Sequence, residues 1–299
     1  MSKHYQVVII GSGIAGMTAG IYLKRGGVDP VIIEESAPGG QLNKVNVIEN
    51  YPGFVKTDGP TLAYEVYNQV KKLKIDYLYD KVIKTDFKNK IKLKTSKETI
   101  TCDYLIIATG KVSRKLFNND DKYIGKGISY CALCDSNLYK NKDVIVVGGG
   151  PSAMEESLYL AKTSKSVTVI NRKDTFHGEQ RLIDELNQKK NIKVVYNSNI
   201  SEYNIENGNL ESVTLDNGDI IKASGLFISI GSVPSTGIFE VKKDKGFIVV
   251  NKDCMTNVKN VYACGDVIKK SVYQLTTAVS EGTIAANSIL KELDKSIKN

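Results

Sequence analysis

The sequence predicts an α/β protein that contains two dinucleotide-binding folds of the Rossmann type. A glycine-rich turn follows a strongly apolar segment at residues 11–16, and a related turn follows another apolar segment at residues 148–153. In both places the order of buried strand, tight turn and helix is typical of a fold that binds a dinucleotide. The two turns begin 148 − 11 = 137 residues apart, so the chain contains two such folds.

The composition is that of an ordinary globular protein. Apolar residues make up 41% of the 299 residues and charged residues 25%, and the length suits one large or two modest domains. The first residues lack the apolar stretch and cleavage site of a signal peptide. The longest uncharged run, residues 6–23, is interrupted by glycines, so no membrane span is expected. Five cysteines, an odd number, favour a reducing cytoplasm.

The chain is basic, with 41 lysines and arginines against 33 acidic residues and a formal charge of +8. Such a positive field attracts acidic partners. The lysines are scattered, however, and the sequence has no tryptophan and no run of interleaved aromatic and basic residues that would stack on bases. We therefore expect no nucleic-acid partner. An acidic protein partner and an ordinary solvated surface both stay open.

The first glycine turn has the full pattern of a dinucleotide site. Residues 5–10 are expected to form a buried strand, residues 11–16 the turn and residues 17–25 the helix. Backbone amides of such a turn and the N-terminus of its helix approach a pyrophosphate. The next strand ends in Glu34, which lies 34 − 11 = 23 residues beyond the first glycine. A carboxylate there accepts hydrogen bonds from a ribose diol, so the pattern predicts an adenosine site for FAD or NAD.

Two loops and a further strand complete the first half of the chain. Residues 38–42 and 49–53 would be ordinary turns in isolation, but either could bring backbone close to a flat ring system. A lysine-rich region that follows is expected to form strands. Residues 104–110 are expected to form a buried strand that ends in a glycine turn, where the chain leaves the first domain.

The second glycine turn lacks the acid of the first. The position that would read the ribose falls at 148 + 23 = 171, which is Asn171, and the basic residues Arg172 and Lys173 follow it. A site without the acid and with basic residues suits a 2′-phosphate better than NAD. The elements expected around this turn are strands at residues 143–147 and 167–170 and a helix at residues 154–162.

The last third of the chain contains three further expected elements. A strand at residues 226–230 would close the second domain. A second strand, at residues 260–266, ends in Asp266, which could reach a ribityl or phosphate group. Residues 281–293 have the pattern of a closing amphipathic helix. Cys264 is interpreted as a buried packing residue.

Cys131 and Cys134 are separated by two residues, a spacing that can form a small disulfide, a reactive dithiol or half of a zinc site. A structural zinc site needs about four ligands, but the other cysteines stand alone and there are only two histidines. Redox chemistry is therefore favoured over metal binding or plain packing. Asp135 could donate and accept a proton near a leaving thiolate, and an exposed turn aspartate is the alternative.

These motifs resemble the low-molecular-weight thioredoxin reductases over essentially the whole chain. The resemblance implies two Rossmann-like three-layer domains, the second inserted in the first. Residues 1–112 and 231–299 would hold FAD, and residues 113–230 would form an NADPH-type domain with the redox cysteines. It also implies a homodimer that acts on thioredoxin. The segments that match the family are residues 11–16, 39–42, 49–53, 108–110, 131–135, 148–153 and 265–266.

The resemblance implies roles for individual residues. Cys134 would face the flavin, Cys131 would attack the disulfide of thioredoxin, and Asp135 would manage the proton. The residues expected to bind FAD are Gly11, Ser12, Gly13, Ala15, Gly16, Glu34, Gly40, Gln41, Leu42, Asn50, Ala108, Thr109, Gly110, Gly265, Asp266, Gln274, Leu275 and Ala278. The last three of these match the family segment that touches the flavin.

The chain departs from the family where NADPH is recognised. Members that use NADPH show His-Arg-Arg-x-x-x-Arg, and this chain has Asn171, Arg172, Lys173 and His177 at those four positions. Lysine does not fully replace a guanidinium, which binds phosphate in bidentate fashion. Tyr273 also stands where the family usually has an arginine.

The departures resemble the ferredoxin-dependent flavin thioredoxin reductases of anaerobic bacteria, which keep the fold without NADPH recognition. A basic surface suits an acidic ferredoxin, so we predict reduced ferredoxin as the electron donor. The alternative is an NADPH enzyme with a weakened phosphate site. Two rivals are a flavin-binding regulator without thioredoxin turnover and a ferredoxin-NADP reductase, which would not need the cysteine pair.

Overall fold

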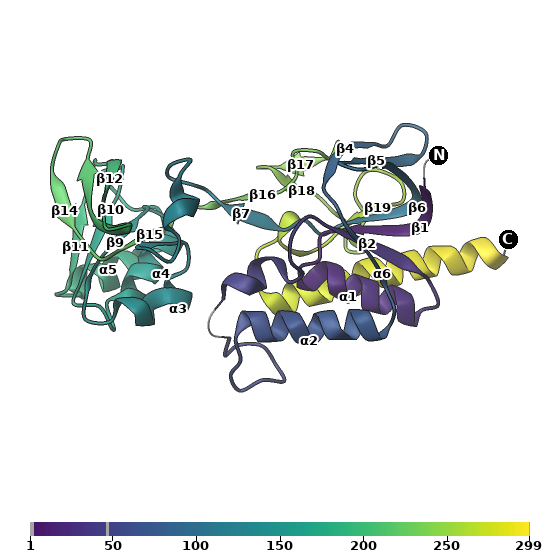
Figure 1. Cartoon of the computed structure of the whole chain (residues 1–299), viewed down its shortest axis with the longest axis horizontal. Helices are drawn as coiled ribbons and strands as arrows, with labels where there is room; N and C mark the ends of the chain where they lie inside the picture. Colours follow the sequence, from purple (N-terminus) through teal and green to yellow (C-terminus); the bar gives the residue numbers. More distant parts are fainter. Residues whose placement is uncertain (1–2, 46–47, 299) are drawn as a thin grey trace. The chain divides into compact units, whose positions relative to one another are not determined.

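Figure 1 shows the computed structural model, which describes residues 3–45 and 48–298. The chain forms two compact units. The first comprises the described parts of residues 1–44, 48–112 and 233–299, and the second comprises residues 113–232 together with Val45. The chain therefore leaves the first unit near residue 112 and returns to it near residue 233. None of the helices in these described ranges is both long enough and apolar enough to cross a bilayer.

The first unit is built on a seven-stranded sheet of order β3-β2-β1-β6-β5-β4, in which β19 also pairs with β6. The β1, β2, β3, β6 and β19 strands run parallel, and β4 and β5 form an antiparallel extension. The strands are β1 (Lys3–Ile10), β2 (Pro30–Glu34), β3 (Asp76–Tyr79), β4 (Val82–Asp86), β5 (Ile91–Thr95), β6 (Thr99–Ile107) and β19 (Val261–Ala263).

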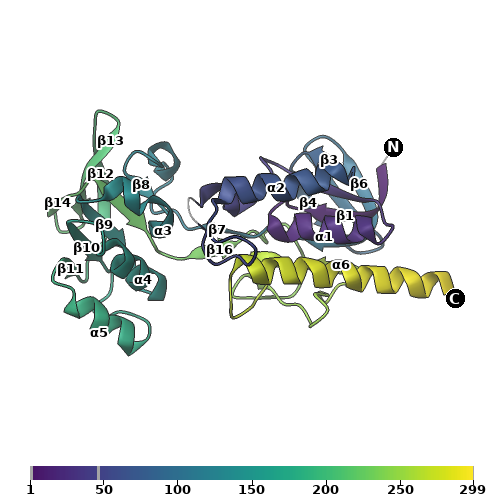
Figure 2. The ribbon, with the colours of Figure 1, turned by 90° about the horizontal axis from the view of Figure 1, so that it is seen from below.

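Three helices lie along one face of this sheet, α1 (Ile14–Arg25), α2 (Gly59–Lys72) and α6 (Leu275–Lys298) (Figures 1 and 2). The α1 and α6 helices pack closely, because a Cβ on Gly282 would lie only 2.3 Å from the backbone oxygen of Ala15. On the other face, Phe239 and Ile248 pack with Val8 and other strand residues. Helices, sheet and returning segment form three layers. Short elements here are η1 (Gly40–Lys44), β17 (Lys243–Asp244), β18 (Phe247–Ile248) and η4 (Gly265–Val267).

The second unit also has three layers, around a parallel sheet of order β11-β10-β9-β15-β8. In its central strand, Val144 and Val146 pack with the helices, whereas Ile145 and Val147 pack with the antiparallel strands, as alternation along a strand requires. The strands are β8 (Ile128–Ser129), β9 (Asp143–Val147), β10 (Ser166–Ile170), β11 (Ile192–Val195) and β15 (Gly225–Ile228).

Helices and an antiparallel sheet cover the two faces of this parallel sheet. The helices are η2 (Asp120–Tyr123), α3 (Ala132–Asp135), η3 (Ser136–Tyr139), α4 (Pro151–Leu160) and α5 (Gln180–Gln188), and the antiparallel strands are β12 (Ile200–Glu206), β13 (Asn209–Leu215) and β14 (Ile220–Lys222). Where the chain passes between the units, β7 (Lys111–Ser113) and β16 (Ser232–Pro234) pair as a two-stranded sheet.

The predicted α/β class is confirmed, but three details of the sequence analysis are wrong. The strand predicted for residues 260–266 ends at Ala263, and Asp266 lies in η4. The last helix, predicted for residues 281–293, begins six residues earlier at Leu275. Packing of α6 against α1 extends the helix through a stretch with two threonines that shows little helical pattern. The α2 helix was not predicted, although Asp58 caps it by accepting a 2.7 Å hydrogen bond from the Thr61 amide.

Candidate functional site

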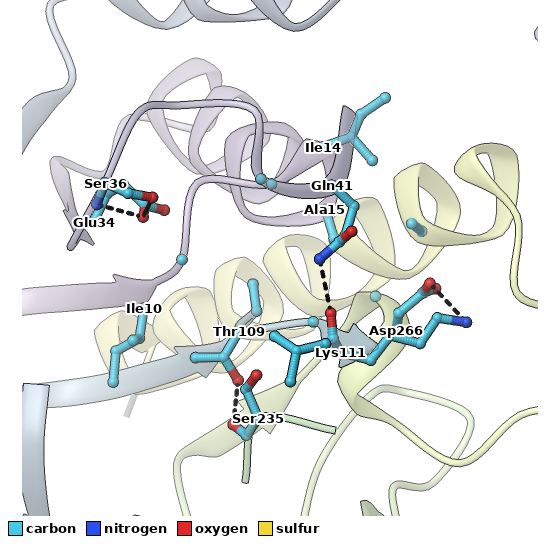
Figure 3. A pocket seen from close by; sticks show the side chains of 18 of the residues that line it. Ile10, Ile14, Ala15, Glu34, Ser36, Gln41, Thr109, Lys111, Ser235 and Asp266 are labelled. Carbon is cyan, nitrogen blue, oxygen red and sulfur yellow. Dashed lines mark hydrogen bonds and ion pairs between the residues drawn. The ribbon is translucent and has the colours of Figure 1, made fainter. Parts of the chain in front are cut away.

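A cavity of about 630 Å³ lies in the first unit at the carboxyl ends of the parallel strands. Figure 3 shows how side chains from β1, β2 and the segment after β6 converge on it. The N-termini of α1 and α6 also reach it, through Ile14 and Leu275. In open parallel sheets this edge is the usual place for a bound ligand.

The first glycine turn forms one wall of the cavity. Gly11 has φ = +99°, a backbone conformation that strongly favours glycine. A Cβ on Gly16 would lie 2.0 Å from the Gly11 carbonyl oxygen, so the turn closes tightly against the helix. The N-cap residue of α1, Gly13, offers no side-chain cap, and the first turn contains no acid. The amides at this helix N-terminus therefore suit an anionic group.

Glu34 stands at the end of β2 and lines the cavity with only 9% of its surface exposed. One carboxylate oxygen accepts hydrogen bonds from the Ser12 amide at 2.8 Å and the Ser12 hydroxyl at 2.9 Å. The other oxygen accepts from the Ser36 amide at 2.9 Å and from the Ser36 hydroxyl at 3.1 Å. These four bonds hold the carboxylate at the cavity wall, where a ribose diol would bond to it by displacing a serine hydroxyl.

A loop of the first unit lies against the glycine turn. The Gly39 amide donates to the Ser12 carbonyl at 2.9 Å, and a Cβ on Gly40 would lie 3.4 Å from Gly13. The side chain of Gln41 donates to the Lys111 carbonyl at 3.0 Å, as Figure 3 shows. Residues 39–42 therefore line the cavity beside the turn rather than forming an independent surface loop.

The far wall contains a charged cluster around Asp266. Its carboxylate lies 3.4 Å from Nζ of Lys111 and 3.2 Å from Nζ of Lys270. Lys270 also contacts the carboxylate of Glu281 at 2.8 Å, yet burial raises the pKa of Glu281. The Lys111 ammonium lies 4.3 Å from the ring centroid of Tyr273. Sequence reasoning assigned only Asp266 in this cluster, because a lysine after a glycine turn has no recognisable pattern.

Most of the residues expected to bind FAD line this one cavity. Three do not. Ser12 is fully buried and holds Glu34, Gly16 packs against Gly11, and Asn50 donates a 3.3 Å hydrogen bond to the cavity residue Gln274. The lining members are Gly11, Gly13, Ala15, Glu34, Gly40, Gln41, Leu42, Ala108, Thr109, Gly110, Gly265, Asp266, Gln274, Leu275 and Ala278.

This set of groups fits an FAD molecule. The glycine turn and the N-terminus of α1 suit its pyrophosphate, and the carboxylate of Glu34 suits its adenosine ribose. Asp266 offers a second carboxylate at the opposite wall. Apolar side chains such as Ile10, Ile14 and Leu42 supply the contacts that a ring system needs.

In the second unit, Cys131 is disulfide-bonded; the side chain of Cys134 lies outside those that the structure describes. Ser129, which is 1% exposed, organises the segment: its hydroxyl accepts from the Cys131 amide at 3.0 Å and donates to Oδ2 of Asp135 at 2.7 Å. The Asp135 amide in turn donates to the Cys131 carbonyl at 3.2 Å. Sequence reasoning missed Ser129, since it precedes the motif.

The second glycine turn leads into α4, whose N-cap is Gly150 and whose first turn contains no acid. Nothing lies within 4 Å of a Cβ built on Gly150. Asn171 is 2% exposed, and its side chain bonds to the Thr175 carbonyl at 2.9 Å and the Lys173 amide at 3.1 Å. Asn171 thus shapes the following loop with both of its polar atoms. The turn offers open backbone to a dinucleotide.

Three exposed basic or titratable side chains follow Asn171 in this loop. Arg172 and Lys173 are both exposed, and Nζ of Lys173 lies 3.2 Å from Nε2 of His177. The His177 amide donates to the Gly149 carbonyl at 2.8 Å, which fixes this residue beside the glycine turn. The loop thus gathers cations where a 2′-phosphate would need them.

Glu156, on α4, was not predicted as a site residue. Its Oε2 atom is buried and has no hydrogen-bond partner among the described residues. Burial raises the pKa of this carboxyl to about 7, against a smaller lowering by a hydrogen bond with Ser229. Glutamate is a common residue within helices, so no sequence pattern identifies Glu156 as a site residue.

Comparison with known proteins gave consistent matches over nearly the whole chain. Residues 5–282 match the family model described as pyridine nucleotide-disulphide oxidoreductase. A thioredoxin reductase from Ureaplasma parvum is 37% identical over 292 residues, covering 94% of each chain. The solved thioredoxin reductase from Streptococcus pyogenes has a TM-score of 0.79 and 33% identity, covering 99% of this chain and 100% of the other. A ferredoxin-flavin thioredoxin reductase from Clostridium acetobutylicum has a TM-score of 0.56 and 28% identity, with coverage of 99% and 100%.

Proposed function

The chain belongs to the thioredoxin reductases, within the pyridine nucleotide-disulphide oxidoreductases, and we propose that NADPH, bound by the second unit, is its electron donor. The protein is an FAD-dependent disulfide oxidoreductase. The donor proposal depends chiefly on the second glycine turn, which has open backbone at Gly150. The loop that contains the exposed Arg172 and Lys173 is hydrogen-bonded to this turn at Gly149. The greater similarity to relatives named simply as thioredoxin reductases supports it too. We therefore propose NADPH as the donor in place of the ferredoxin predicted from the sequence.

We propose that the cavity of the first unit holds FAD, which when bound supplies two-electron transfer between a nicotinamide and a disulfide. Glu34 would accept hydrogen bonds from the ribose, and the α1 N-terminus would bind the pyrophosphate. Lys111 and Asp266 would form the opposite wall.

Cys131 and Cys134 would exchange with the thioredoxin disulfide. The Cys131 thiolate attacks one sulfur of that disulfide, which forms a mixed disulfide and releases the other thioredoxin sulfur as a thiolate. The Cys134 thiolate then attacks Cys131, so the chain regains its disulfide and thioredoxin keeps two electrons. Asp135, held by Ser129 at 2.7 Å, would exchange the proton with the thiol.

Ferredoxin is the second candidate donor. Asn171 is buried and is neither cationic nor directed at a phosphate, which weakens the case for NADPH. The formal charge of +8 suits an acidic protein donor. The two donors make different demands. NADPH needs the phosphate loop of the second unit, whereas a protein donor would act through the surface charge and would be sensitive to ionic strength.

The deciding experiment is anaerobic reduction of the holoenzyme by NADPH, NADH and reduced ferredoxin in parallel, followed by stopped-flow absorbance of the flavin. We expect rapid bleaching with NADPH at micromolar concentration and slower bleaching with NADH. Bleaching by ferredoxin alone would overturn the donor proposal and leave the reductase assignment intact. Loss of thioredoxin turnover in Cys131→Ser would distinguish the reductase from a flavin-binding regulator.

We further propose a homodimer that works in the reducing cytoplasm. The buried thiols Cys102, Cys254 and Cys264 are free, and burial raises the pKa of Cys102 and of Cys254 to about 12, so these thiols stay protonated and inert. Sedimentation of the holoenzyme would test the dimer.

A further inference from the structure

A fully buried carboxylate lies in the second unit beside the redox segment. Asp120, in η2, is 0% exposed. One of its oxygens accepts hydrogen bonds from the Leu116 amide at 2.7 Å and the Tyr130 hydroxyl at 2.6 Å. The other accepts from the Phe117 amide at 2.9 Å and the Tyr203 hydroxyl at 2.8 Å. All four acceptor positions are therefore used, which a buried carboxylate requires.

The two phenols connect this carboxylate to different parts of the unit. Tyr203 belongs to β12 and packs edge-on against Phe117, with ring centroids 4.7 Å apart. Tyr130 immediately precedes Cys131. Burial, and then the bond to Asp120, raises the pKa of both phenols, so both remain donors over the working pH range.

The segment Ser129–Cys131 is thus fixed at successive residues. Ser129 bonds to Asp135 and pairs with Phe227 in the sheet, Tyr130 bonds to Asp120, and the Cys131 amide donates to the Ser129 hydroxyl. Nothing in the motif of two cysteines and an acid requires the bond between Tyr130 and Asp120. Its position suggests that it fixes the approach to the disulfide.

We propose that Asp120 is a positioning residue for the redox disulfide and that it acts through Tyr130. The inference rests on the proposed exchange function of Cys131. A cysteine on a fixed backbone has a high effective concentration toward its partner thiol, and this favours the closed disulfide over the dithiol. Loosening the segment lowers that effective concentration and makes the disulfide easier to reduce.

The test compares Tyr130→Phe with Tyr203→Phe, which each remove one phenol donor from the same carboxylate. Wild-type and variant holoenzymes are equilibrated anaerobically with graded ratios of reduced and oxidised dithiothreitol, then acid-quenched and alkylated. Dithiothreitol gives two electrons and two protons to the protein disulfide and becomes a cyclic disulfide. The mass of the Cys131 peptide reports the dithiol fraction.

We expect Tyr130→Phe to shift the equilibrium toward the dithiol by about tenfold, which corresponds to about 30 mV for a two-electron couple. Tyr203→Phe should lower the unfolding temperature as much as Tyr130→Phe does, but it should leave the equilibrium between dithiol and disulfide unchanged. Asp120→Asn keeps the shape of the side chain but leaves only one accepting oxygen, so it should shift the equilibrium in the same direction as Tyr130→Phe. Equal shifts in both tyrosine variants, or no shift in Tyr130→Phe, would overturn the inference alone. A wild-type disulfide that does not exchange at all would overturn the proposed function as well.

Discussion

A Cβ atom on Gly11 would lie 2.5 Å from the carbonyl oxygen of Ala108. This contact joins the end of β1 to the end of β6, because the Ala108 amide also donates to the Ile10 carbonyl at 2.8 Å. The close approach brings the first glycine turn and the turn at Gly110 to the same cavity wall. The proposed FAD site therefore depends on a position where no side chain fits.

Gly11→Ala should destabilise the protein before cofactor binding is considered. Both its φ of +99° and the contact with Ala108 oppose a methyl group, and we expect a loss of about 2–3 kcal/mol in the free energy of unfolding of the apoprotein. Gly13→Ala is the matched control, since nothing lies within 4 Å of its Cβ. It should cost about 1 kcal/mol or less but weaken FAD binding. Urea unfolding and FAD titration separate the two effects; equal stability losses would contradict the prediction.

Lys111→Gln should weaken FAD binding, because it removes the ammonium that lines the cavity and pairs with Asp266. We expect the dissociation constant, measured by fluorescence titration of the apoprotein, to rise about tenfold, or about 1.4 kcal/mol. Lys81→Gln is the control. Lys81 lines the cavity near Glu34 and pairs with Glu35 at 2.7 Å with an exposed side chain, so its loss should change binding less than about twofold. Similar losses in both variants would refute a specific role for Lys111.

Glu156→Gln should remove a pH dependence of stability. The folded pKa of Glu156, about 7, lies above its ordinary value of 4.5, so the folded state holds this proton more tightly than the unfolded state. Its contribution to stability is full below about pH 4.5 and is lost as the pH rises through 7, by about 3 kcal/mol in total. Urea unfolding from pH 5 to 8 should show Glu156→Gln to be more stable than wild type at pH 8. The exposed neighbour Glu155 raises the pKa of Glu156 less than burial does, so Glu155→Gln should leave most of this pH dependence in place.

His177→Arg should tighten NADPH binding. The side chain at this position lies 3.2 Å from the Lys173 ammonium, beside the glycine turn, and a guanidinium adds bidentate bonds to a phosphate. We expect the KM for NADPH to fall about tenfold while that for NADH stays unchanged. Asp174→Asn makes the same change in net charge in the same loop without the guanidinium, and should improve NADPH use less than about threefold. Parallel changes for both nucleotides would argue against a phosphate site here.

The fold class could be predicted from the sequence because its signals are local. Apolar runs such as Val7–Ile10 end at glycine turns, and burial on both faces of a parallel sheet leaves such runs little choice of structure. Glu34 could be placed for the same reason, since a fixed number of residues separates the first turn from the end of the next strand.

The rest depended on contacts between distant segments. Lys111 meets Asp266 across 155 positions (266 − 111), and Asp120 meets Tyr203 across 83; no local pattern encodes either pair. The α2 helix was missed because its polar face is broad and its start lies among loop residues, although Asp58 and Pro60 are typical of a helix N-terminus. The predicted ferredoxin donor is unconfirmed: it depended on single substitutions at Asn171 and His177, whereas similarity over the whole chain favours the alternative, an NADPH enzyme.

The discontinuous first unit has a consequence for biosynthesis. Its sheet needs β19 against β6, and its helical layer needs α6 against α1, yet both arrive in the last part of the chain. The second unit, apart from Val45, is one continuous segment that leaves the ribosome earlier. Residues 113–232 follow the N-terminal strands in the sequence but are thus the first to have nearly all their unit available for folding. Until β19 is made, the N-terminal strands have an open sheet edge, a state that favours chaperone binding.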